Sequence, residues 1–156
     1  MVLNQNEGKW YSEGQPYSGF ALIYHPDGSI AERIGFYEGK KEGITHKWYL
    51  DGTHKYKVTY HANKKNGVAK NWSNGEVLIA ESNFENGVVN GVQTRWYESG
   101  NIFKKANINN GIEEGLQQTW WENGKLYVNY EAKNGRVYGL KRSTLCYELE
   151  NEIIQK

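Results

Sequence analysis

The sequence predicts an all-β protein: an elongated, single-layer antiparallel sheet of repeated β-hairpins, twisted and curled. Glycines recur every 24 residues, and an aromatic residue follows five positions after each of the first five glycines. A second glycine, preceded by Asp, Asn or Ser, marks a tight turn in every unit. The three columns are Gly19, Gly43, Gly67, Gly91, Gly115 and Gly139; Tyr24, Trp48, Trp72, Trp96 and Trp120; and Gly28, Gly52, Gly75, Gly100 and Gly124. Each unit is therefore a strand, a turn, a strand and a turn.

The 156 residues are the length of one domain, and we expect a single repeat domain over 1–156. Five 24-residue hairpin repeats cover 17–138. A half-unit over 1–16 precedes them as an N-terminal cap, and 139–156 follow as a C-terminal cap. Cys146 is expected to be a buried residue of that cap rather than a nucleophile.

Composition excludes several classes of protein. No run of 18 apolar residues is present, so we expect no transmembrane helix, and the N-terminus lacks the pattern of a signal peptide. The single cysteine forbids an internal disulfide and fits a cytoplasmic location, with a secreted or surface location left open if a signal peptide was removed. A net charge of +1 gives no overall attraction to nucleic acid, which is not expected as a partner.

The alternation of side chains along each strand predicts which residues are buried. An apolar column begins the first strands, and the aromatic column lies four residues further on, on the same face. A three-residue turn would place the even-numbered residues of both strands together on that face, and the polar odd-numbered residues outside. The tryptophans are then core, with a stacking platform for a glycan as the alternative. The apolar column is Phe20, Ile44, Val68, Val92, Leu116 and Leu140.

Two inward columns vary in chemistry between repeats, whereas packing alone would make them uniformly apolar. We therefore predict that they line a groove that binds a partner protein. The candidate groove residues are His46, Tyr56, Lys70, Thr94, Lys104 and Gln118.

Positive charge is concentrated between Gly39 and Asn71, a stretch that contains eight lysines and only two acidic residues, Glu42 and Asp51. On the outer face, Lys47, Lys55 and Lys57 would form a basic patch for an acidic protein, a lipid headgroup or a phosphate chain. The alternative is a set of solvated lysines that discourage aggregation of sheet edges.

No catalytic cluster, cofactor motif or metal site is predicted, and the protein is not expected to be an enzyme. His46 and His54 would share a face across one hairpin, but a third metal ligand is missing. No cofactor is therefore expected.

The repeat resembles the MORN repeat, and specifically the bacterial variant found in the YwqK-like antitoxin family. The resemblance covers about residues 9–140, and it departs from the family pattern in the third unit, where Ser73 follows Trp72. It implies a non-catalytic, protein-binding module that neutralises a partner toxin as an antitoxin or immunity protein. Binding of anionic lipid or another polyanion by the basic patch remains an alternative, as does glycan binding on the aromatic ladder; the oligomeric state is left open. The matching stretches are 38–52, 86–100 and 110–124.

Overall fold

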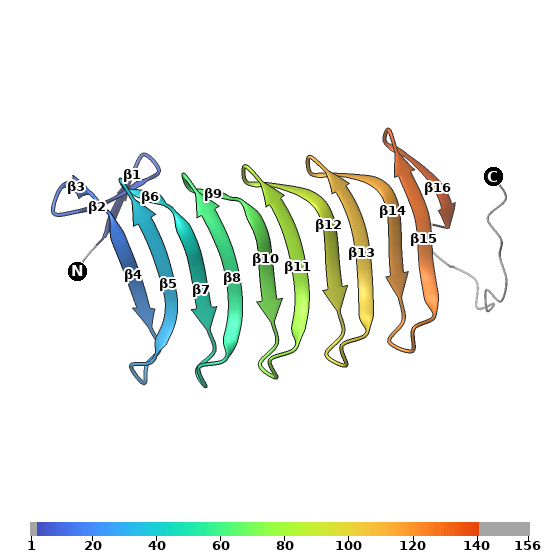
Figure 1. Ribbon diagram of the computed structural model, residues 1–156, viewed down its shortest axis with the longest axis horizontal. Coiled ribbons are helices and arrows are strands. Elements are labelled where there is room, and N and C mark those ends of the chain that lie inside the picture. Colours follow the sequence, from blue (N-terminus) through green and yellow to red (C-terminus); the bar gives the residue numbers. More distant parts are fainter. Residues whose placement is uncertain (1–2, 141–156) are drawn as a thin grey trace.

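The computed structural model describes residues 3–140, which form sixteen strands in two antiparallel sheets (Figure 1). Between these residues no helix is present that is long and apolar enough to cross a membrane. The predicted C-terminal cap beyond Leu140, with Cys146, lies outside the described residues. The strands are β1 Asn4–Asn6, β2 Lys9–Ser12, β3 Gln15–Pro16, β4 Gly19–Tyr24, β5 Ile30–Tyr37, β6 Lys40–Lys41, β7 Gly43–Trp48, β8 His54–His61, β9 Lys64–Lys65, β10 Gly67–Trp72, β11 Leu78–Glu85, β12 Val88–Trp96, β13 Ile102–Asn109, β14 Ile112–Trp120, β15 Leu126–Lys133 and β16 Arg136–Leu140.

The predicted fold class is confirmed. A 13-stranded sheet runs in chain order from β4 to β16, with the short strands β6 and β9 pairing at the ends of β5 and β8. Figure 1 shows the hairpins side by side in one row, in the order of their colours. Among residues 3–140 the sheet is open, and β4 and β16 are its two edges.

A separate three-stranded sheet, β1–β3, is attached to the end of the first repeat. The rings of Trp10 and Tyr17 each meet Phe36 edge to face at 5.8 Å between centroids. The backbone N–H of Trp10 donates to the carbonyl of Gly39 at 2.7 Å. These contacts cover Phe36, which is buried.

The prediction that even-numbered residues of both strands share a face is wrong, because each of the five repeat hairpins contains a β-bulge. In the second hairpin Trp48 lies opposite His54 next to the turn, but Lys47 lies opposite Tyr56, so Lys55 is an extra residue on β8. Beyond this point the odd-numbered residues of the first strand pair with even-numbered residues of the second. The same shift occurs in the other four hairpins.

The sheet therefore has two faces of different character, which we name the core face and the ladder face. The core face carries most of the buried residues, among them Thr45, Val58, Ala69, Ala106, Gln117 and Tyr130. The ladder face carries the aromatic column together with the apolar column that was predicted to be buried. That prediction is wrong, since Phe20 is 62% exposed and Val92 is 45% exposed. The four tryptophans of the ladder are half-buried and do not form a closed core.

A backbone feature and a side-chain contact recur along the sheet. Glycines of the 24-residue column begin β4, β7 and β10 and lie inside β12, β14 and β16; Gly91, in β12, has a φ of 93°, which a side chain would strain. The hydroxyls of Tyr49 and Tyr97 donate to the carbonyls of Trp72 and Trp120 in the following repeat, both at 2.9 Å.

Candidate functional site

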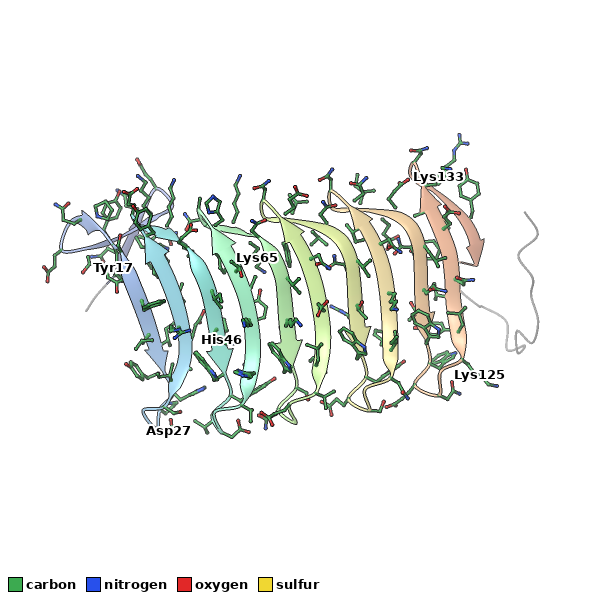
Figure 2. All side chains as sticks on the ribbon, viewed as in Figure 1. Tyr17, Asp27, His46, Lys65, Lys125 and Lys133 are labelled. Carbon is green, nitrogen blue, oxygen red and sulfur yellow. The ribbon has the colours of Figure 1, made fainter. Side chains whose placement is uncertain are left out.

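The core face contains a hollow of about 550 Å³ that spans the strands from β5 to β11. Figure 2 shows Lys65 near the β9 end of these strands, and His46 further along β7. Lysines and aromatic rings predominate around the hollow. Its lining residues are Glu32, Lys41, Thr45, Lys47, Lys55, Tyr56, Tyr60, Lys65, Ala69, Asn71, Ser82 and Phe84.

The hollow exists because small residues form its floor. Ala69 lies opposite Ser82 across the β10–β11 pair, and Thr45 lies one repeat earlier in the same column as Ala69. In the next two repeats that column holds Gln93 and Gln117, whose longer side chains donate to the carbonyls of Asn83 and Asn107. The larger side chains of this column in the later repeats therefore mark the end of the hollow on that side, and Glu32 of the first hairpin completes its lining on the other.

Three of the cation–aromatic contacts hold lysines over rings of the lining. The Nζ of Lys65 lies 4.9 Å from the ring centroid of Phe84 and 5.8 Å from that of Tyr56. The Nζ of Lys41 lies 5.4 Å from the centroid of Tyr60. A ring face attracts an ammonium group but carries no net charge. These contacts therefore position Lys41 and Lys65 without neutralising them.

The charge of the hollow is unbalanced. Its lining has four lysines and one carboxylate, that of Glu32, which leaves a net positive charge of three. Glu32 pairs with Lys47 at 3.0 Å. Burial raises the pKa of Tyr56 and that of Tyr60, so both hydroxyls stay protonated at neutral pH and can donate hydrogen bonds. The arrangement suits an anionic group that also presents an apolar or aromatic surface.

The structure divides the predicted basic patch between the two faces. Lys47 and Lys55 line the hollow together, because the bulge turns Lys55 to the same side as Tyr56. Lys57 lies on the ladder face, opposite His46 and beside Lys70. Sequence reasoning counted Lys41 and Lys65 in the lysine cluster but did not name them as patch residues, although their 24-residue separation marks them as one column.

The predicted groove residues also fall on both faces. His46, Lys70, Thr94 and Gln118 lie on the ladder face, whereas Tyr56 and Lys104 lie on the core face. Lys70 is paired with Glu81 at 3.2 Å. The six residues therefore do not line one continuous groove, and only Tyr56 belongs to the hollow.

The predicted proximity of His46 and His54 is confirmed. Their rings stack at 5.0 Å with an angle of 7° between the planes, and His54 also meets Trp72 at 5.7 Å. Burial, and then the neighbouring His54 and Lys57, lower the pKa of His46. Residues 3–140 contain no group of three His, Cys, Asp or Glu side chains that could hold a metal ion. The pair acts as aromatic packing in the ladder.

Comparison with known proteins identifies the repeat. A family model described as "MORN repeat variant" matches residues 89–110 and 113–134. These stretches cover most of β12–β13 and of β14–β15, and the preceding hairpins have the same bulge and the same order of strands. No curated protein matches the chain. Residues 89–134 thus match two MORN repeats of the variant type, and they lie within a sheet of stacked β-hairpins.

Proposed function

We propose that this protein is a non-catalytic binding module and that its core-face hollow holds an acidic segment of a partner protein. One observation carries the proposal: four lysines and three aromatic rings surround a hollow of about 550 Å³ in which Glu32 is the one carboxylate of the lining. Carboxylates of the partner would bind the ammonium groups of Lys41, Lys55 and Lys65. An apolar or aromatic residue between them would lie against Tyr60 and Phe84.

A protein segment fits the hollow better than a flat charged surface does. The lysines lie around a depression in a single-layer sheet. A segment that enters the depression displaces water and contacts the aromatic rings and the small residues of the floor. Charge pairs that are shielded from water are worth more than exposed pairs, and they set the orientation of the bound chain. The resemblance to the antitoxin family supports the further step that the partner is a toxin, which this module neutralises by occupying an acidic segment of it.

The test compares two double variants that change net charge equally. Lys41→Glu with Lys65→Glu reverses two charges in the hollow. Lys57→Glu with Lys105→Glu reverses two exposed charges on the ladder face, and it serves as the matched control. Affinity is measured by fluorescence anisotropy for a labelled peptide of alternating Glu and Tyr residues. We expect the hollow variant to bind at least about tenfold more weakly and the control to change by less than about threefold.

Equal losses in both variants would show that binding follows net charge and not the hollow. Vesicles containing phosphatidylserine are tested in parallel: retention on vesicles without peptide binding would favour the anionic-lipid alternative. For the toxin step, the full-length protein and both variants serve as baits in an extract of the source cells. The expected partner is a protein that binds the wild type and the control variant but not the hollow variant. When this partner is expressed in cells, co-expression of the wild type or the control variant should relieve its toxicity, and co-expression of the hollow variant should not.

A further inference from the structure

The edge strand β4 differs from the interior first strands in its side chains. In the interior repeats, two consecutive residues of the first strand, such as His46 and Lys47, pair with the second strand of the preceding repeat. At the equivalent positions β4 has Leu22 and Ile23. These side chains are 40% and 48% exposed. The equivalent interior pairs each contain polar or charged residues, namely His46–Lys47, Lys70–Asn71, Thr94–Arg95 and Gln118–Thr119. The edge of the sheet is thus more apolar than its interior, which is the opposite of a protected edge.

The outer side of β4 also presents backbone groups. The carbonyl of Gly35 accepts a hydrogen bond from the N–H of Glu42, on the side of β5 away from β4. Phe20, which lies opposite Gly35, therefore directs its N–H and C=O away from β5, and so does Leu22 two residues on. The hydroxyl of Tyr17 donates to the carbonyl of Phe20 at 2.9 Å. Within residues 3–140, no strand pairs with the outer edge of β4, so Leu22 offers both of its backbone groups there.

We propose that β4 pairs antiparallel with β4 of a second copy of this chain, about a two-fold axis at Leu22. Three features select a second copy. The strand has no charged residue, so identical strands do not repel each other. The pairing matches apolar residues throughout, with Leu22 opposite Leu22, Phe20 opposite Tyr24 and Ala21 opposite Ile23. A two-fold contact is complete with two copies, so the assembly stops at a dimer in which the two sheets form one continuous sheet.

A disulfide trap tests the register directly. Residues in a hydrogen-bonded antiparallel pair have Cα atoms about 5.5 Å apart, within the roughly 4.4–6.8 Å that a disulfide spans. Leu22→Cys in a full-length Cys146→Ser background should therefore give a covalent dimer under mild oxidation. Leu50→Cys, at an exposed turn leucine, is the matched control and should stay monomeric.

Sedimentation equilibrium then measures the reversible association of the otherwise unmodified protein. Leu22→Lys places two ammonium groups opposite each other at the axis, and we expect it to weaken the dimer at least about tenfold, whereas Leu50→Lys leaves it unchanged. Circular dichroism checks folding, and if Leu22→Lys does not fold the disulfide trap decides. The proposal fails if Leu22→Cys forms no more dimer than Leu50→Cys. It also fails if Leu22→Lys associates as the wild type does, or if the protein forms open filaments, which indicate head-to-tail pairing of β4 with β16.

Discussion

Val58 and Val68 are the same residue type in neighbouring strands, yet they lie on opposite faces of the sheet. Val58 is completely buried on the core face opposite Thr45, whereas Val68 is 40% exposed on the ladder face opposite Asn83. Hydrophobic pattern alone made Val68 a core residue, because it belongs to a column that is apolar in every repeat. The β-bulge reverses that assignment. Burial here depends on strand register rather than on side-chain type.

A matched pair of substitutions measures this reversal. Val58→Ala should lower the free energy of unfolding by about 2–3 kcal/mol, because it removes two buried methyl groups and leaves a cavity. Val68→Ala should cost less than about 1 kcal/mol, since its side chain already contacts water. Urea unfolding followed by tryptophan fluorescence gives both values. Equal losses, or a larger loss at Val68, would contradict the assignment of the two faces.

At the scale of the element, the hairpin was predictable but its faces were not. The 24-residue period, the turn glycines and the aromatic column each follow from residues whose type is nearly fixed. The bulge residues have no common type: they are Ala31, Lys55, Ile79, Phe103 and Tyr127. Because many side chains are tolerated there, no residue type marks the bulge in the sequence. An assignment of faces by simple alternation therefore ignores the bulge and places the following residues on the wrong face.

The same limit applied to the candidate site. Charge clustering pointed to the second repeat, and it named Lys47 and Lys55, which line the hollow. It also named Lys57, which the bulge places on the other face. Lys41 and Lys65 were not named as patch residues because they lie next to turns, in the short strands β6 and β9, and not in the main strands of the hairpins. The hollow itself depends on the small side chains of Ala69 and Ser82, whose effect appears only when the strands are paired.

The contact between successive turns is another property of the element, and its contribution can be measured. Tyr97 donates its hydroxyl to the carbonyl of Trp120, so Tyr97→Phe removes one partly buried hydrogen bond and keeps the ring against Phe103. We expect a loss of about 1 kcal/mol in unfolding free energy. Tyr37→Phe, at an exposed tyrosine, is the control and should change stability by less than about 0.5 kcal/mol. A loss at Tyr97 no larger than the control would show that the ring, and not the hydroxyl, joins the hairpins.

At the scale of the whole molecule, each strand of the large sheet pairs, within residues 3–140, only with strands of its own or an adjacent hairpin. Stability is then a sum over hairpins and their neighbours, and a complete period can be removed without breaking distant contacts. Deletion of residues 104–127 joins Phe103 to Val128 and removes one 24-residue period. The hybrid strand keeps its bulge, and Tyr130 then faces Gln93 on the core face. The hollow between β5 and β11 is left intact.

This shortened protein should unfold cooperatively, with a denaturant dependence lower by about one sixth, because 24 of 156 residues are gone and the exposed area falls with them. It should bind the acidic peptide as the full-length chain does. Deletion of residues 105–127 differs by one retained residue, Lys104, and it shifts the remainder of the strand by one position. That shift moves Tyr130 and Ala132 to the ladder face, so we expect a large loss of stability. If both deletions unfold alike in urea, the hairpins depend on contacts beyond their neighbours, and the repeat would not be the unit of stability.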